Sequence, residues 1–129
     1  MDDQRVWEFE GSLWDASDEH YQDRIDEEIV MVLPRPPYVF QGQEAKDAVK
    51  ATPDWDTVEL SDRRVSRPQE GLIVVAYTAR CASGDEKYEA HCTSTLRMRG
   101  HDDWLVVQHQ QTPPLTASVE AWPLGCRCA

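Results

Sequence analysis

The first half of the chain carries apolar residues at helical spacing. An amphipathic helix over residues 5–17 is predicted by one such series: Val6, Phe9, Leu13 and Ala16. A stripe beside it repeats every seven residues: Trp7, Trp14 and Tyr21. Ser17 is a candidate N-cap followed by carboxylates, which predicts a second helix over residues 17–28. Residues 42–52 form a third predicted helix, which Pro53 ends.

The rest of the chain has the composition and turn signals of strands. Residues 29–33 and 38–40 are short candidates separated by three prolines. Four longer candidates follow over residues 56–67, 72–82, 87–99 and 104–112, with glycine-containing turns between them. The order predicts an α+β fold in which three N-terminal helices pack on a strongly curved, mainly antiparallel sheet.

Two tight turns set the predicted pairing of the last three strands. A turn at Gly84 and Asp85 places Arg80 opposite Glu89 and Tyr77 opposite Cys92. A second turn, at 100–103, is expected to place Arg99 opposite Trp104. It then pairs Ser94 with His109, Cys92 with Gln111 and Leu96 with Val107. This register turns Leu105 and Val107 toward the helices, and Trp104, Val106, His91 and Arg97 toward the outer face.

The inward face of this predicted sheet changes from apolar to polar near the end of the last strand. Apolar walls with a few convergent polar groups are typical of a small-ligand pocket. We therefore expect an internal pocket, with Tyr21 reaching its mouth from the helices. The predicted ligand-binding residues are Tyr21, Tyr77, Cys92, Ser94, His109 and Gln111.

Length and charge narrow the classes of protein. The 129 residues suit one domain, predicted over residues 1–114, with a C-terminal tail at 115–129. The net charge of −11 opposes binding to nucleic acid or to an anionic membrane surface. Eleven carboxylates lie within residues 1–28, where they form either a solvated helical face or an acidic docking surface.

The chain's start lacks the basic and apolar segments of a secretory signal, and no apolar run is long enough to cross a membrane. We therefore expect a cytoplasmic protein with reduced thiols. Cys126 and Cys128 form an isolated C-x-C pair without a second half-site, so we expect no metal, and no cofactor either.

Several segments resemble the nuclear transport factor 2-like (cystatin-like, SnoaL-like) superfamily. They are "LWD", "HYQDRIDEEIVMVLP", "PDWDTVELSDRRV", "YTARCASGDEKYEA" and "CTSTLRMRGHDDWLVVQHQQTP", within residues 6–114. The similarity is greatest to uncharacterised bacterial single-domain proteins related to ketosteroid isomerase and the calcium/calmodulin-dependent kinase II association domain. It implies a cone-shaped half-barrel that forms a homodimer through the outer sheet face. It implies no activity, because this fold hosts enzymes, binding modules and assembly domains.

The ketosteroid isomerases and SnoaL-like cyclases of this superfamily depend on an Asp in the pocket. No Asp or Glu falls on the predicted inward face of the last three strands, which argues against either chemistry here. The first hypothesis is a homodimeric small-molecule-binding protein. The second is a general acid–base enzyme, an isomerase, dehydratase or cyclase, with His109 as proton carrier and Tyr77 or Tyr21 as electrophile. The third is a non-catalytic assembly module.

Overall fold

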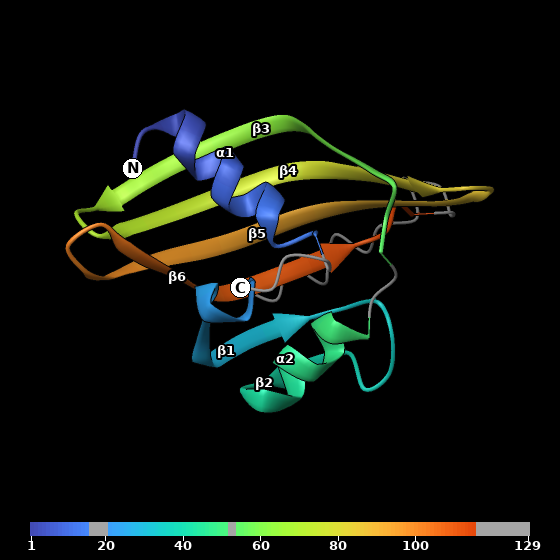
Figure 1. Ribbon diagram of the computed structural model, residues 1–129, viewed down its shortest axis with the longest axis horizontal. Helices are drawn as coiled ribbons and strands as arrows, with labels where there is room; N and C mark the ends of the chain where they lie inside the picture. The colour runs from blue at the N-terminus through green and yellow to red at the C-terminus, as the bar shows by residue number, and fades with distance from the viewer. Residues whose placement is uncertain (16–20, 52–53, 116–129) are drawn as a thin grey trace, which may run out of the picture.

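The computed structural model describes residues 1–15, 21–51 and 54–115 (Figure 1). The helical elements are α1 (Asp3–Ser12), the short 3-10 helix η1 (Tyr21–Arg24) and α2 (Gln43–Lys50). The strands are β1 (Ile25–Val32), β2 (Val39–Gln41), β3 (Thr57–Gln69), β4 (Leu72–Ser83), β5 (Glu86–Gly100) and β6 (Asp103–Thr112). No helix among these residues is long and apolar enough to cross a membrane.

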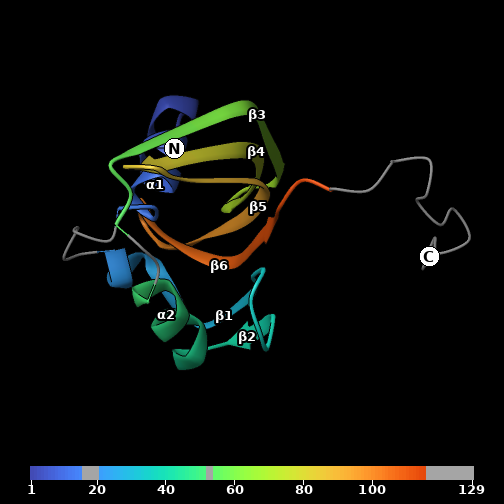
Figure 2. The ribbon, with the colours of Figure 1, turned by 90° about the vertical axis from the view of Figure 1, so that its right-hand side faces the viewer.

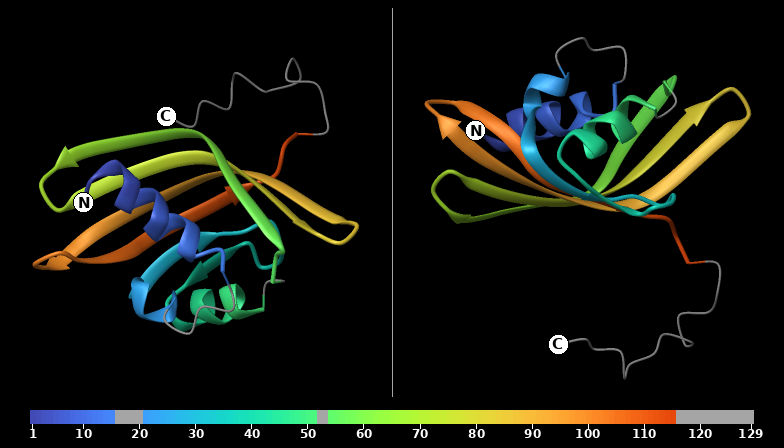
Figure 3. Two further views of the ribbon diagram at one scale, coloured as in Figure 1. Left: turned by 45° about the horizontal axis from the view of Figure 1, so that its top comes forward. Right: turned by 90° about the horizontal axis from the view of Figure 1, so that it is seen from below.

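All six strands form one sheet in the order β2-β1-β6-β5-β4-β3. Neighbouring strands are antiparallel except β1 and β6, which run parallel. The sheet is curved and unclosed (Figure 2), and both α-helices lie on the same side of it (Figure 3, right). The predicted α+β class and the curved, mainly antiparallel sheet are therefore confirmed.

The prediction of a second helix over residues 17–28 is wrong for its C-terminal part. Residues 25–28 begin β1, and only Tyr21–Arg24 form a helical turn. Ile25, Ile29 and Met31 are buried against the core, and β1 gains backbone pairing with β6. Asp26 accepts a hydrogen bond of 2.7 Å from Arg97 of β5. Tertiary pairing thus overrides the local helical signals, and the described residues contain two α-helices instead of three. Ser17 lies outside them.

The first helix forms as predicted but is shorter. Asp2 caps it, because its carboxylate accepts a hydrogen bond of 2.9 Å from the backbone N–H of Arg5. The helix ends at Ser12, so Leu13 and Trp14 leave it as an irregular segment. Its two buried residues are Val6 and Glu10, one helical turn apart on the same face. A carboxylate is thereby carried into the core.

The predicted register of the β4–β5 hairpin is confirmed along its length. Arg80 pairs with Glu89 and forms an ion pair of 2.7 Å with it, and Tyr77 lies opposite Cys92. The far half of the β5–β6 hairpin is also as predicted, with Ser94 opposite His109 and Cys92 opposite Gln111. These pairs bring the polar residues of three strands to one place on the inner face.

Near its turn, the β5–β6 register differs from the prediction by one residue. Thr95 pairs with Gln108 but Leu96 pairs with Val106, so Val107 is an extra residue, a β-bulge. The pairs Leu96–Val106 and Met98–Trp104 follow from this shift. Trp104 and Val106 therefore point into the core, where the prediction had placed Leu105 and Val107.

Candidate functional site

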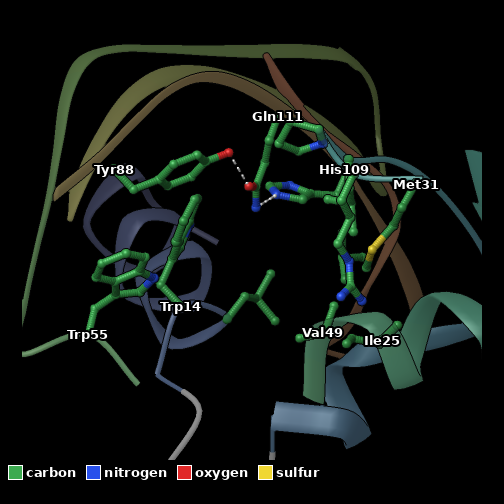
Figure 4. Close-up of a pocket in the computed structure, with 13 residues that line it drawn as sticks. Trp14, Ile25, Met31, Val49, Trp55, Tyr88, His109 and Gln111 are labelled. Carbon is green, nitrogen blue, oxygen red and sulfur yellow. Dashed lines mark hydrogen bonds between the residues drawn. The ribbon is translucent and has the colours of Figure 1, made fainter. Parts of the chain in front are cut away.

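A cavity of about 280 Å³ lies between the sheet and the helices. Its walls come from the segment after α1, from β1 and the turn that follows it, from α2, and from β5 and β6 (Figure 4). Most of the lining is apolar or aromatic: Leu13, Trp14, Ile25, Met31, Leu33, Pro34, Val49, Trp55, Tyr88 and Val106. The polar lining residues are Arg35, His109 and Gln111. Such a lining suits a small, mainly apolar molecule with a polar group.

Gln111 connects Tyr88 and His109 at one end of the cavity, which we call its polar end. Its amide oxygen accepts a hydrogen bond of 2.8 Å from the Tyr88 hydroxyl, and its amide nitrogen lies 3.1 Å from Nε2 of His109. In Figure 4 the Gln111 side chain lies between Tyr88 and His109. Trp55 stacks on Tyr88, with ring centroids 6.1 Å apart and an interplanar angle of 12°. The polar end is thus supported by strands β5 and β6 and by the segment before β3.

Behind His109, away from the cavity lining, a buried hydrogen-bond chain leads to α1. Nδ1 of His109 lies 2.7 Å from the Ser94 hydroxyl oxygen. That hydroxyl donates a hydrogen bond of 2.5 Å to Oε2 of Glu10. Ser94 and Glu10 have no solvent exposure, and His109 is 8% exposed. A fully buried carboxylate thus lies one hydroxyl away from the imidazole at the cavity.

Tyr77 completes the surroundings of this carboxylate. Its hydroxyl donates a second hydrogen bond of 2.5 Å to Oε2 of Glu10 and accepts one of 3.1 Å from the indole N–H of Trp14. The other carboxylate oxygen, Oε1, is buried without a hydrogen-bond partner. Both hydroxyl groups that donate to Glu10 therefore share one of its oxygens, Oε2.

Burial shifts the pKa of both groups at the ends of this hydrogen-bond chain, Glu10 and His109. Desolvation raises the pKa of Glu10, and the hydrogen bonds from Ser94 and Tyr77 oppose that rise. Desolvation lowers the pKa of His109 to about 4, although a backbone hydrogen bond to Thr93 opposes it. His109 is consequently a neutral imidazole at neutral pH, and its contact of 3.8 Å with Glu10 is not an ion pair there.

Five of the six residues predicted to bind a ligand fall into three groups. His109 and Gln111 line the cavity. Ser94 and Tyr77 lie behind them and contact Glu10. Cys92 is buried beside them, donates weakly to the carbonyl of Ala90 at 3.7 Å, and has its pKa raised by desolvation to about 12. The sixth, Tyr21, begins η1, and its side chain lies outside what the structure describes.

Sequence reasoning missed Glu10 because it counted this residue among acids that form either a solvated helical face or an acidic docking surface. The strands indeed supply no inward carboxylate in this cluster; α1 supplies it. A signal was available, because Glu10 follows Val6 by four residues and precedes Leu13 by three, which places all three on one face of a helix. Arg35 was missed as well, since it lies in a proline-rich turn without periodicity.

Within residues 1–15, 21–51 and 54–115, no group of three or more His, Cys, Asp or Glu side chains could hold a metal ion. Cys126 and Cys128, the isolated pair at the C-terminus, lie outside this range. Cys81 and Cys92 are free, buried thiols.

Comparison with solved structures decides the fold. A "putative ketosteroid isomerase" from Parabacteroides distasonis superposes with a TM-score of 0.75 at 14% identity, covering 86% of each chain. A nuclear transport factor 2-like protein of unknown function in nutrient uptake from Rhodospirillum rubrum gives 0.70 at 17% identity, over 88% of this chain and all of that one. The chain has the nuclear transport factor 2-like fold. No family model and no curated protein matches the sequence.

Hub domains match the structure as well. A calcium/calmodulin-dependent kinase II hub from S. rosetta matches with a TM-score of 0.65 at 12% identity, over 86% of this chain and 95% of the hub. At such identities the likeness concerns the fold alone. Any functional argument must therefore rest on features of this nuclear transport factor 2-like domain itself. These are the cavity, the Glu10–Ser94–His109 chain and the outer sheet face, opposite the two described α-helices.

Proposed function

We propose that this protein binds a small, mostly apolar molecule with one polar end inside the cavity, and that His109 and Gln111 orient that end. The observation that carries the proposal is the cavity itself: about 280 Å³ of space with an apolar lining and hydrogen-bonding groups gathered at one side. This volume is near the lower end of the roughly 300–1,000 Å³ usual for ligand pockets. The ligand is accordingly small.

The internal hydrogen bonds support the same conclusion. Ser94 and Glu10 fix one side of the His109 ring, and Tyr88 fixes the Gln111 amide. Side chains held in this way meet a ligand without losing further conformational freedom, which favours binding. Gln111 still has a second amide N–H to offer, because only one of the two is directed at His109.

Octanamide, a neutral amphipathic probe, tests the proposal by saturation-transfer NMR and calorimetry. We expect saturable binding of one equivalent per chain. Val49→Trp fills the cavity from α2 and should abolish this binding. Val30→Trp makes the same change at an exposed position on β1 outside the cavity and should leave binding intact. Failure to bind octanamide, or equal binding by both variants, would contradict the proposal.

We further propose that two copies associate through the outer face of the sheet, on which the described residues place no helix (Figure 3, right). A groove on this face is lined by residues of mixed polarity, including Ala76, Thr78, His91 and Thr93. Sedimentation should give a dimer for the wild type and a monomer for Thr93→Arg. The alternative function as an assembly module also depends on this face, and a monomeric wild type would contradict both.

A general acid–base enzyme is the second candidate, and the Glu10–Ser94–His109 chain is what favours it. His109 Nε2 would take a proton from a bound carbonyl compound while Nδ1 passes its proton to Ser94, and Ser94 passes its own to Glu10. The proton lost by the ligand thus ends on Glu10, and the reverse sequence returns it to another ligand atom. Tyr77 acts here through Glu10, as a positioning residue.

Exchange of the α-hydrogens of 2-heptanone with D₂O, followed by proton NMR, tests this second candidate. Exchange faster than in buffer, lost in both His109→Gln and Glu10→Gln, would support it. Exchange no faster than in buffer, or unaffected by His109→Gln, would remove it and leave the binding proposal standing.

A further inference from the structure

Within the described part of the chain, one formally charged side chain lines the cavity at neutral pH. Arg35 lies in the turn between β1 and β2, and the other lining residues are apolar, amide, phenol or neutral imidazole groups. Nothing else in the lining competes for its charge. The guanidinium of Arg35 can therefore pair with a negatively charged group of a ligand.

The guanidinium is held in place but is not neutralised. One terminal nitrogen donates a hydrogen bond of 3.2 Å to the carbonyl of Ala48 near the C-terminal end of α2, and the group lies over the ring of Phe40, 5.9 Å from its centroid. Among the residues that the structure describes, Arg35 has no carboxylate partner, whereas five other arginines do: Arg5, Arg67, Arg80, Arg97 and Arg99. Most of its five N–H donors remain for another acceptor.

Arg35 and the amide end of the cavity lie at the same end of two adjacent strands. Val32 of β1 pairs with Gln110 of β6, so the chain leaves β1 beside Gln111, and Arg35 follows three residues later. Gln111 has a free N–H, and its amide oxygen already accepts from Tyr88. Both polar groups at this end of the cavity therefore present donors, which suits a ligand rich in acceptors.

We propose that the ligand is a small amphipathic carboxylic acid, bound as its anion with the carboxylate on Arg35 and the apolar body against the aromatic and aliphatic lining. The inference rests on the binding function proposed above and specifies the ligand class. A planar guanidinium fork matches a carboxylate with two parallel hydrogen bonds. A single positive charge balances one carboxylate but not a phosphate monoester with nearly two negative charges.

The location of Arg35 also explains how an anion enters a protein with a net charge of −11. Arg35 is solvent-exposed, so the carboxylate stays partly hydrated and avoids the full cost of burial. The deep end of the polar cluster holds Glu10, and an anion placed there would meet a second buried carboxyl group. The apolar body, not the carboxylate, therefore occupies the interior.

Calorimetry with octanoate, octanamide and octylamine on the purified wild-type chain tests the inference at low ionic strength. We expect octanoate to bind about fivefold more tightly than octanamide, and octylamine to bind least. Arg35→Gln should bring octanoate to within about twofold of octanamide while octanamide binding persists. Arg99→Gln, which alters an exposed arginine paired with Asp103, is the matched control and should keep the preference.

The outcomes separate the two proposals. Octanamide binding as tightly as octanoate, or an octanoate preference that survives Arg35→Gln, would overturn the carboxylic-acid inference and leave the cavity function standing. Binding of none of the three probes would overturn the cavity function together with the inference. Loss of the octanoate preference in Arg35→Gln but not in Arg99→Gln would support both the cavity function and the carboxylic-acid inference.

Discussion

Glu10 and His109 are joined through a single hydroxyl: Oγ of Ser94 lies 2.5 Å from Oε2 of Glu10 and 2.7 Å from Nδ1 of His109. Because the Ser94 proton is donated to Glu10, Ser94 accepts from His109, and Nδ1 must carry the hydrogen. Nε2 is then the acceptor, which the Gln111 amide meets at 3.1 Å. A carboxylate on α1 therefore fixes the tautomer that His109 directs toward the cavity.

Two substitutions of Glu10 separate its role as an acceptor from its charge. Glu10→Gln keeps an oxygen for the Tyr77 and Ser94 hydroxyls and removes a carboxyl group whose ionisation burial opposes, so the free energy of unfolding at neutral pH should change by less than about 1 kcal/mol. Glu10→Leu leaves both buried hydroxyls without their acceptor and should cost at least about 2 kcal/mol. Urea unfolding measures both. Equal stability of the two variants would show that Glu10 does not organise this cluster.

The pH dependence of stability should contain a contribution from His109. Its pKa is about 4 in the folded chain, against a reference of 6.5. Between these values the unfolded chain binds a proton that folded His109 does not, so stability falls as the pH drops from 6.5 toward 4, by about 3 kcal/mol in total.

The raised pKa of Glu10 acts in the opposite sense, since the folded carboxyl takes up a proton at higher pH than the unfolded one. The His109 contribution is therefore best measured between Glu10→Gln and the double variant Glu10→Gln, His109→Gln. Their free energies of unfolding should converge as the pH falls from 6.5 to 4. Parallel curves across this window would mean that His109 titrates normally in the folded protein.

The buried thiols should be unreactive. Desolvation raises the pKa of Cys81 to about 11 and that of Cys92 to about 12, so almost no thiolate exists at pH 8. In a chain with Cys126→Ser and Cys128→Ser, a disulfide reagent should label neither remaining cysteine until the protein is unfolded in urea. Rapid labelling of the folded double variant would show that Cys81 or Cys92 is accessible to the reagent and would contradict the burial of these thiols.

The polar end of the cavity was predictable from sequence because turn chemistry and charge pairing set the strand register. Arg80 opposite Glu89 fixes the β4–β5 pairing, and that pairing carries through to Ser94 and His109. The bulge at Val107 was not predictable, because no glycine or proline marks it. The predicted register resumes at Gln108, so the errors for Trp104 and Val106 changed the apolar lining at Val106 but did not reach His109 and Gln111.

Two other features were missed, one because it depends on tertiary contacts and one because an acidic composition outweighed a local pattern. Residues 25–28 have helix-compatible composition, yet Ile25 is buried and pairs with Val106 of β6, and the segment begins β1. Glu10 lies in an acidic segment, yet it shares a face of α1 with Val6 and is buried with it. For Glu10, the burial of an apolar neighbour thus outweighs the preference of the polar residue for solvent.

Long-range proton–nitrogen NMR of the imidazole nitrogens, with His109 assigned from the His109→Gln variant, tests the cavity account most directly. The free protein should show His109 neutral with its hydrogen on Nδ1. Saturation with octanamide should shift His109 Nε2 and leave His91 unchanged, because His91 lies on the outer face and is bonded to Thr78. A His109 signal that does not move at saturation, or a His91 signal that moves equally, would contradict ligand binding at this site.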